Sequence, residues 1–343
     1  MKLRVAFAGF RHMHLREAYR TVRDRPDLAV SAVSEEDPGV RELIESRDGI
    51  RVTHHSHETL LENADFDILV VGEVFSRRGA LILRALSSGR HVLSDKPICI
   101  SIAELEAIED AAGRTGLAVG AMLELRDAGV FRSLRGLVRG GTLGAVHAAA
   151  FNGQHPLLLD DRPRWYFQPG LHGGTLNDLA VHALDLLPWL TGRRFSRLLA
   201  ARCWNAGLPE QPDFRNAAQL MLEMEGGLGV IGDVSYLSPD GFGYSLPMYW
   251  RFTLWGEEGA VEGGLNTAGL ALYRRRRSEP EVIAPEPSRP GGYLDRLLEA
   301  TADDEIRRQG NCELLAATRV ALLAQHSADQ GSTGLPIPPG APG

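Results

Sequence analysis

The sequence predicts an α/β protein in which an N-terminal, doubly wound parallel sheet is followed by an α/β domain with an open, mostly antiparallel sheet. In the first third of the chain, short apolar runs alternate with helical patterns, as in parallel strands joined by crossover helices. Beyond residue 195 most segments have strand patterns. Because 343 residues suggest two domains more readily than one, we expect domains at 1–124 and 125–330. The Gly- and Pro-rich residues 331–343 are expected to form a flexible tail.

The first domain is expected to alternate strands and helices along its whole length. Strands are expected at Leu3–Ala8, Ala29–Val33, Ile68–Val71, His91–Ser94 and Ala118–Met122. Helices are expected at His14–Arg23, Val40–Glu45, His57–Leu61, Gly79–Ser87 and Ile102–Thr115. Ser101 followed by Glu104 resembles a capping box, which gives the last of these helices a firm start. This is the outline of a nucleotide-binding doubly wound unit.

The second domain is expected to begin with a helix at Phe131–Arg139 and a strand at Ala145–Asn152. An aromatic loop at Asp160–Leu171 then leads into a helix that contains Asp178 and His182. Further strands are expected at Leu198–Trp204, Ala217–Glu225, Leu228–Tyr236, Tyr249–Trp255, Ala260–Glu262 and Leu270–Arg274. Helices return at Tyr293–Thr301 and Glu313–Ser327.

The composition is that of an ordinary globular protein. The formal net charge of −7 gives no support to nucleic-acid or anionic-membrane binding, and the run Arg274–Arg277 is expected to be a solvated hairpin or loop. Three cysteines far apart indicate no disulfide framework, and we expect a cytoplasmic protein. No apolar stretch is long enough for a signal peptide or a membrane span.

The most informative segment is the one that follows Gly173 and Gly174. Asp178, His182 and Asp185 recur there at spacings of four and three, which would place them on one face of a helix. The neighbouring residues are mostly apolar, so this face is expected to be buried rather than solvated. A carboxylate beside an imidazole fixes its tautomer and raises its basicity, as a proton-transferring group requires.

Lys96 is the second informative residue. It is the only lysine besides Lys2, while arginine is abundant. Unlike a guanidinium, an ammonium can lose its proton when it is desolvated, so the two cations are not equivalent. Lys96 follows the short strand His91–Ser94, and ligands of open parallel sheets lie beyond such carboxyl ends.

Together these motifs resemble the Gfo/Idh/MocA dehydrogenases. The matching residues are Gly9 after the first strand, Asp95-Lys96-Pro97 after a later one, and the glycine pair followed by Asp178 and His182. The resemblance covers most of the chain and implies a Rossmann domain followed by an open-sheet domain that forms the oligomer interface. It implies hydride transfer between a nicotinamide cofactor and a sugar, inositol or related polyol or ketone, and it implies a homodimer or homotetramer. By this resemblance Lys96, Asp178 and His182 are the catalytic residues.

The cofactor loop departs from the family pattern. Gly-x-Gly-x-x-Gly would read Gly9-Phe10-Arg11-His12-Met13-His14, so only the first glycine is present. Glu35 aligns with the acid that binds the adenosine ribose, which favours NAD over NADP. The Thr-Pro pair and the histidine expected after the third strand are also missing. The expected cofactor contacts are Gly9, Phe10, Arg11, His12, Met13, Glu35, Glu73, Asp95 and Lys96.

Substrate contacts are expected from Arg126, Trp165 and His172, together with the catalytic Asp178 and His182. Asp185 either contacts substrate or forms a structural hydrogen bond. His12 or His14 could reach the substrate side, but we expect no metal. Two alternatives to a dehydrogenase remain open: a redox-neutral sugar hydrolase or epimerase that retains NAD, and a non-catalytic ligand-binding relative.

Overall fold

The first part of the chain forms a parallel sheet that is wound in both directions from its first strand. A computed structural model describes residues 2–338, and all statements below concern these residues. Five strands in the order β2-β1-β3-β4-β5 make this sheet. Its strands are β1 (Leu3–Ala8), β2 (Leu28–Ser34), β3 (Ile68–Val71), β4 (His91–Ser94) and β5 (Val119–Ala121). Its helices are α1 (His14–Asp24), α2 (Pro38–Asp48), α3 (His57–Asn63), α4 (Phe75–Ser87) and α5 (Ile102–Thr115).

The strand order reverses between β1 and β3, since β1 pairs in parallel with both β2 and β3. A single parallel bridge between Ser34 and His54 extends the sheet beyond β2. In such sheets the ligand crevice lies at the carboxyl ends of the strands where the order reverses. The loops after β1, β3 and β4 therefore meet at one edge.

The second sheet has nine strands within the described residues, in the order β13-β12-β11-β10-β6-β9-β8-β7-β14. Only β6 and β9 are parallel neighbours there, and the other neighbouring pairs are antiparallel. The predicted fold class is confirmed. The strands are β6 (Val146–Pro156), β7 (Phe195–Trp204), β8 (Ala217–Met224), β9 (Leu228–Ser238), β10 (Arg251–Gly256), β11 (Gly259–Gly264), β12 (Leu270–Arg274), β13 (Glu281–Ile283) and β14 (Leu335–Pro336).

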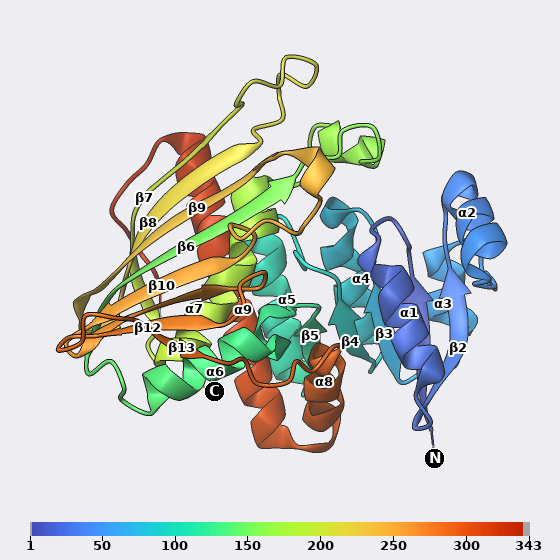
Figure 1. Ribbon diagram of the computed structural model, residues 1–343. Helices are drawn as coiled ribbons and strands as arrows, with labels where there is room; N and C mark the ends of the chain where they lie inside the picture. The colour runs from blue at the N-terminus through green and yellow to red at the C-terminus, as the bar shows by residue number, and fades with distance from the viewer. Residues whose placement is uncertain (1, 339–343) are drawn as a thin grey trace.

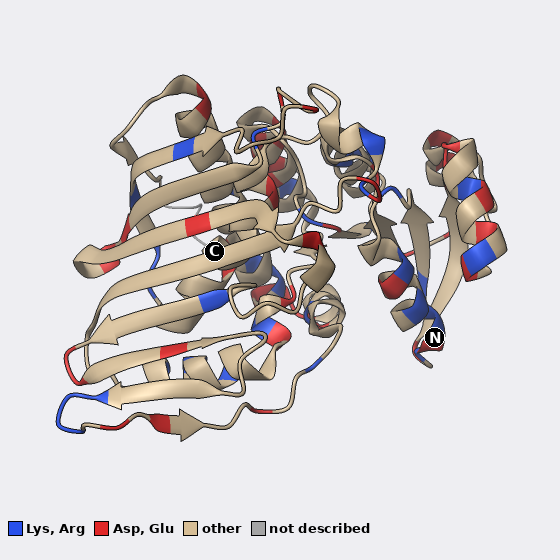
Figure 2. Cartoon of the chain, turned by 45° about the horizontal axis from the view of Figure 1, so that its top comes forward, with Lys and Arg blue, Asp and Glu red and all other residues tan. Residues whose placement is uncertain are grey.

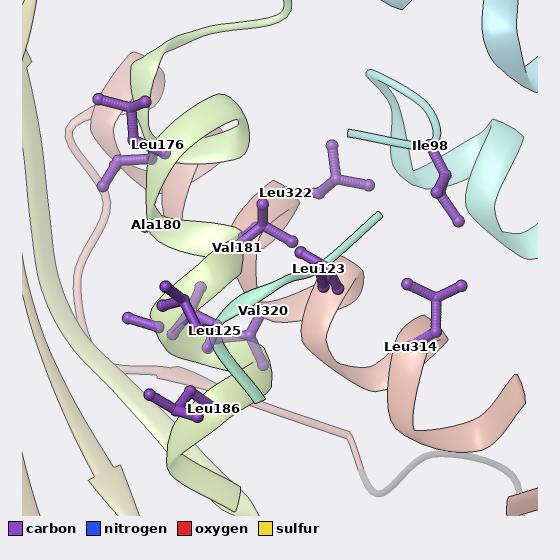
Figure 3. Packing of buried hydrophobic residues seen from close by; sticks show 14 of the residues in the cluster. Ile98, Leu123, Leu125, Leu176, Ala180, Val181, Leu186, Leu314, Val320 and Leu322 are labelled. Carbon is purple, nitrogen blue, oxygen red and sulfur yellow. The ribbon is translucent and has the colours of Figure 1, made fainter. Parts of the chain in front are cut away.

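Helices cover one face of this sheet (Figure 1). They are α6 (Gly129–Arg139), α7 (Val181–Thr191) and α9 (Asp304–Gln330), and a π-helical turn (Leu176–Ala180) precedes α7. Figure 3 shows Leu123 and Leu125 beside Val181 of α7 and Val320 of α9, and the four side chains belong to one apolar cluster. Short 3-10 turns lie at Leu125–Asp127, Arg164–Phe167, Glu225–Gly227 and Asp240–Phe242.

The opposite face of the large sheet is open in Figure 2. Strand alternation places five large apolar side chains on it: Met221, Ile231, Trp255, Tyr273 and Val282, which are 44–71% exposed. The arginine run forms the solvated hairpin between β12 and β13, as predicted. In this view basic and acidic residues are interspersed rather than gathered on one face (Figure 2).

The end of the chain returns to the first domain. Helix α8 (Gly292–Ala302) buries Leu294 and Leu297 against the parallel sheet, in one cluster with Phe7 and Leu93. The domain boundary at 124/125 stays a prediction. It places α8 in the second domain, although α8 packs on the sheet of the first domain. Part of the tail is also ordered, because β14 pairs with β7 and Ile337 is buried. Residues 339–343 of that predicted tail lie outside the described residues. None of the described helices is both long and apolar enough to span a bilayer.

Candidate active site

A buried ion pair between the two domains forms the centre of the site. Lys96 Nζ lies 2.6 Å from Asp178 Oδ1 and 3.2 Å from the Asp178 carbonyl oxygen. Lys96 is 4% exposed and Asp178 is 1% exposed. The structure thus brings together two of the three predicted catalytic residues, although 82 positions separate them in the sequence.

Asp178 lies in the π-helical turn and accepts further hydrogen bonds from His172 and Tyr236. The Gly174 N–H donates to His172 Nδ1, which leaves the proton on Nε2, and Nε2 donates to Asp178 Oδ2 across 3.2 Å. Burial alone would raise the pKa of Asp178, but the Lys96 ammonium and the His172 hydrogen bond hold it well below its usual range. Asp178 is therefore a permanent carboxylate that fixes the Lys96 ammonium.

The glycine pair places this turn against α9 and the loop after Lys96. Gly173 and Gly174 have φ angles of +76° and +96°, where a side chain is strained. A Cβ on Gly174 would lie 2.1 Å from Gln325 Cδ, and one on Gly173 would lie 2.4 Å from Ile100 Cγ2. Gln325 Oε1 in turn accepts from Leu176 N, the first residue of the π-helical turn. Both glycines are required by backbone conformation and close packing.

His182 is the third predicted catalytic residue, and it is not oriented by Asp178 as the helical spacing predicts. In the described chain no hydrogen bond joins the two, and the buried His182 Nδ1 has no partner. The cause is the π-helical turn, which ends at Ala180 and changes the angular relation of positions 178 and 182. Burial, followed by the Lys96 charge, lowers the pKa of His182 well below its usual value. Its imidazole is therefore neutral at neutral pH and packs on Trp250.

Lys96, Asp178 and His182 line one cavity of about 520 Å³ between the domains. This volume is within the usual range for small-molecule sites. The N-terminal domain contributes His12, His14, Glu17 and Glu124 to its wall, and the C-terminal domain contributes aromatic residues and Arg162. The aromatic side chains of the wall are Tyr166, Tyr236, Tyr244, Tyr249 and Trp250, with Tyr293 from α8.

Arg78 is a site residue that the sequence analysis missed. It is fully buried and donates to the Lys96 and Pro97 carbonyl oxygens, to the Glu73 carbonyl oxygen and to Asp95 Oδ2. It stands in the segment where the family pattern has its histidine. Arginine is so frequent in this chain that nothing in the sequence marked this one. Its contacts fix the backbone on both sides of the Lys96–Pro97 bond, which is cis.

Asp95, His12 and His14 form a cluster beside Lys96. Nδ1 of each histidine lies 2.9 Å from a different Asp95 oxygen. Possible ligand atoms of the three lie within 4.8 Å of one another, so this group, and likewise Glu36–His57–Glu73, could hold a metal ion. Burial alone would raise the pKa of Asp95, but the Arg78 charge, together with His12 and His14, holds it well below its usual value. The Arg78 guanidinium already balances the charge of Asp95.

His57, the first residue of α3, forms a buried pair with Glu73. It is 2% exposed, and its two nitrogens lie 2.8 Å from Ser34 Oγ and from Glu73 Oε2. Glu73, predicted to contact the cofactor, is also fully buried in this pair.

The predicted cofactor loop lies at the carboxyl end of β1. Gly9 has φ +85°, and a Cβ there would lie 2.8 Å from the Glu73 backbone nitrogen. Phe10 N donates to Glu35 Oε2 across 2.6 Å, and Glu35 is fully buried. Arg11 N donates to the Gly72 carbonyl oxygen, while its guanidinium lies 3.2 Å from Asp37. Met13 is the N-cap of α1 and makes no side-chain cap hydrogen bond.

The three other predicted substrate contacts lie outside the cavity. Arg126 pairs with Asp185 across 2.6 Å and also with Glu313, so the three residues form one ion cluster. Trp165 donates to the Arg11 carbonyl oxygen across 3.2 Å and packs on Phe75. His172 reaches the site only through Asp178 and Tyr236. The resemblance to the family matches positions in the sequence, and it does not show which side chains Arg126, Trp165 and His172 contact.

Comparisons with known proteins agree with this architecture. Residues 3–122 match the model of the oxidoreductase family with an NAD-binding Rossmann fold, and residues 131–262 match the GFO/IDH/MocA C-terminal domain. The chain belongs to the GFO/IDH/MocA family.

Several members of the family are similar over nearly the whole chain. Inositol 2-dehydrogenase 2 of Saccharopolyspora erythraea is 25% identical over 317 residues, which cover 89% of this chain and 86% of that protein. The dTDP-3,4-didehydro-2,6-dideoxy-alpha-D-glucose 3-reductase of Streptomyces violaceoruber is 26% identical over 303 residues, covering 87% and 81%.

Solved structures share the fold. An inositol dehydrogenase homologue from Azotobacter vinelandii, crystallised with NAD+, has a TM-score of 0.77 at 19% identity, covering 98% of this chain and 97% of that one. The aldose-aldose oxidoreductase from Caulobacter crescentus, crystallised with glycerol, has a TM-score of 0.78 at 23% identity, covering 97% and 99%.

This GFO/IDH/MocA chain is thus an NAD-dependent oxidoreductase, and its N-terminal domain fits the dinucleotide. No side chain caps the N-terminus of α1, and the helix dipole there favours a pyrophosphate, while the Leu15 and Arg16 N–H groups donate to the His12 and Met13 carbonyl oxygens. Carboxylates cluster at the end of β2. Glu35, the predicted ribose contact, is buried under Phe10, whereas Glu36 and Asp37 beside it are partly exposed.

Proposed function

We propose that this chain is an NAD-dependent dehydrogenase or reductase that acts on a CH–OH group of a sugar, inositol or related polyol, or on the corresponding ketone. The observation that carries the proposal is the meeting of the Lys96 ammonium and the neutral His182 imidazole in one cavity at the edge of the parallel sheet. Oxidation of an alcohol needs such a pair, because a cation stabilises the negative charge on the oxygen and a neutral base accepts the hydroxyl proton. The named activities of the relatives support the same substrate class.

Each side chain has a separate task in this proposal. Lys96 uses two of its three N–H groups on Asp178, and the third donates to the substrate oxygen and stabilises its negative charge. His182 takes the hydroxyl proton, which requires the neutral imidazole that its burial favours. Asp178 holds Lys96, rather than His182, in position.

NAD, when bound, supplies the nicotinamide ring that exchanges a hydride with the substrate carbon. The α1 N-terminus and the loop Gly9–Met13 would hold its pyrophosphate. The acids at the end of β2, Glu35 to Asp37, would repel a 2′-phosphate, so we propose NAD over NADP as the cofactor.

The test is the formation of NADH from NAD during incubation with a panel of inositols, alditols and aldoses. Oxidation of at least one member with matching NADH release is the expected result. Conversion of a substrate with no net NADH would support the redox-neutral alternative. Failure of NADH to bind in a fluorescence titration would support a non-catalytic relative.

We also propose that a second copy of this chain covers the open face of the large sheet. Met221 and Ile231 are register partners on β8 and β9, and the strand register places Trp255 and Tyr273 on the same face. An apolar patch of this kind is typical of an interface. Light scattering should give a dimer or tetramer, and Ile231→Glu should give a monomer. A monomeric wild-type protein would contradict the proposal.

A further inference from the structure

One cation in the wall of the 520 Å³ cavity, Arg162, has no ion-pair partner within residues 2–338. Arg162 lies on the loop between β6 and the 3-10 turn Arg164–Phe167. Its Nε donates to the Leu157 carbonyl oxygen and its Nη2 donates to the Pro156 carbonyl oxygen, both across 2.8 Å. These two bonds fix the plane of the guanidinium and leave three of its five N–H groups, on Nη1 and Nη2, without use.

Aromatic rings pack against this guanidinium, which is half-buried. Its Cζ lies 5.0 Å from the ring centre of Tyr166 and 5.4 Å from that of Tyr236. Both rings also line the cavity. An anion that meets Arg162 there would interact in a medium of low dielectric constant, where the attraction is much stronger than in water.

Two deeply buried arginines elsewhere in the described chain have carboxylate partners. Arg78 pairs with Asp95, and Arg126 pairs with Asp185 and Glu313. Arg162 makes no ion pair within residues 2–338. The other cation in the cavity, Lys96, is already neutralised by Asp178. A half-buried guanidinium without an ion-pair partner is free to pair with an anionic group of a ligand.

We propose that Arg162 is a specificity residue that binds a carboxylate of the substrate, so that the sugar or polyol oxidised here is a sugar acid. The proposal rests on the proposed function, because it identifies the substrate class of the same cavity. The free edge of the fixed guanidinium matches a carboxylate through two parallel hydrogen bonds.

The charges of the cavity also orient such a substrate. Glu17 and Glu124 lie in the wall that the N-terminal domain contributes, whereas Arg162 lies in the wall from the C-terminal domain. A substrate carboxylate is attracted to one wall and repelled by the other. The neutral hydroxyl groups of the sugar are thereby left for Lys96 and His182.

The experiment compares acids with matched neutral sugars on the NADH-loaded, full-length protein. Isothermal titration calorimetry measures the dissociation constants of D-glucuronate against D-glucose and of D-gluconate against D-glucitol. D-glucose 6-phosphate is a third arm, which separates a phosphate from a carboxylate. The variants are Arg162→Met, Arg162→Lys, which keeps the charge if the methionine variant folds poorly, and Arg202→Met. Arg202 is a matched control, because it is exposed and stacks on Trp204 away from the cavity.

The wild-type protein should bind at least one acid about tenfold or more tightly than its neutral partner. Arg162→Met should weaken acid binding roughly ten- to hundredfold and leave neutral binding within about twofold, since hydrogen bonds to charged groups have this strength. Arg162→Lys should fall between the two, and Arg202→Met should match the wild type.

The proposal would be overturned if the wild-type protein bound the neutral sugars as tightly as the acids or more tightly, or bound no acid at all. It would also be overturned if Arg162→Met lost acid and neutral binding equally, or if the wild-type protein preferred the phosphate to both acids. Acid binding that depends on Arg162, without NADH formation from NAD and any of these acids, would contradict the proposed dehydrogenase activity. It would leave the proposed role of Arg162 in binding a carboxylate unchanged.

Discussion

Lys96 is held in a way that suits an electrostatic role. Asp178 fixes its ammonium, and Arg78 fixes the backbone on both sides of it, so the cation needs no rearrangement when an alkoxide develops nearby. Preorganised charge of this kind is often the largest single contribution to catalysis.

The substitution Lys96→Met should therefore lower kcat by roughly 10²–10⁴-fold while NADH affinity changes little. Steady-state kinetics and a fluorescence titration with NADH measure the two quantities. The chain offers one matched control, Lys2→Met, because Lys2 is the only other lysine and is exposed. Full activity of the Lys96 variant would refute the proposed role.

The cluster of His12, His14 and Asp95 makes a second prediction at the same scale. Because the Arg78 charge satisfies Asp95, treatment with EDTA followed by gel filtration should leave activity and thermal stability unchanged. Elemental analysis of the purified protein should find less than about one metal ion per ten chains. Loss of activity that zinc or manganese restores would instead assign a metal to these three side chains.

Some of these residues could be predicted from sequence because their types are rare or their pattern is distinctive. The single lysine after a strand pointed to Lys96, and the glycine pair pointed to Asp178. Arg78 and Arg162 could not be found, because arginine is common in this chain and only three-dimensional contacts separate a buried guanidinium from a solvated one.

At the scale of elements, the segment from Gly173 to Thr191 determines the site. A regular helix would place Asp178, His182 and Asp185 on one face. The π-helical turn instead sends Asp178 to Lys96, leaves His182 facing the cavity, and sends Asp185 to Arg126. A π-helical turn has no reliable signature in a single sequence, so the three roles could be predicted only as a group.

The glycine pair is predicted to hold this turn in place. Gly174→Ala should reduce the free energy of unfolding by roughly 1–3 kcal/mol more than Gly170→Ala. Both positions have positive φ, but a Cβ on Gly170 meets nothing within 4 Å, whereas one on Gly174 meets Gln325. Urea unfolding measures the difference. The shift of Gln325 should also break its bond to Leu176 N and lower kcat, and equal destabilisation by the two variants would contradict this.

Asp185 tests whether the third acid of the segment is structural. Asp185→Asn removes the charge that pairs with the buried Arg126 guanidinium and should cost about 3–5 kcal/mol of stability. Because neither residue lines the cavity, the KM for the substrate should change by less than about twofold. Glu313→Gln, at the more exposed end of the same cluster, should cost less. A large rise in KM at unchanged stability would instead indicate that Asp185 contacts the substrate.

For the whole molecule, the order of elements and both sheet types followed from patterning, but the path of the last helices did not. The sequence analysis placed two late helices, Tyr293–Thr301 and Glu313–Ser327, in the second domain. The pattern of their apolar residues does not indicate which sheet each helix packs against. In the structure α8 packs on the parallel sheet, so it joins the two domains around the cavity.

The closed interface between the domains also determines how stability should depend on pH. His12, His155 and His182 are all less than 10% exposed. Burial is the main cause that lowers the pKa of His12 to about 4, that of His155 to about 3, and that of His182 well below 6.5. In the unfolded chain each imidazole titrates near its usual value of about 6.5.

Below pH 6.5 the unfolded chain therefore binds protons that the folded chain excludes, and the free energy of unfolding must fall as the pH falls. For three histidines the loss should be about 4 kcal/mol between pH 7.5 and pH 5.5. Burial raises the pKa values of Glu35 and Asp185, so these two carboxyl groups make the free energy of unfolding rise as the pH falls, which is opposite to the effect of the histidines. Their effect lies mainly at lower pH, where carboxyl groups titrate in the unfolded chain. Guanidinium unfolding at a series of pH values measures the curve. His155→Gln should make it shallower by about a third, and a flat profile in the wild type would mean that these imidazoles are solvated rather than buried at the domain interface.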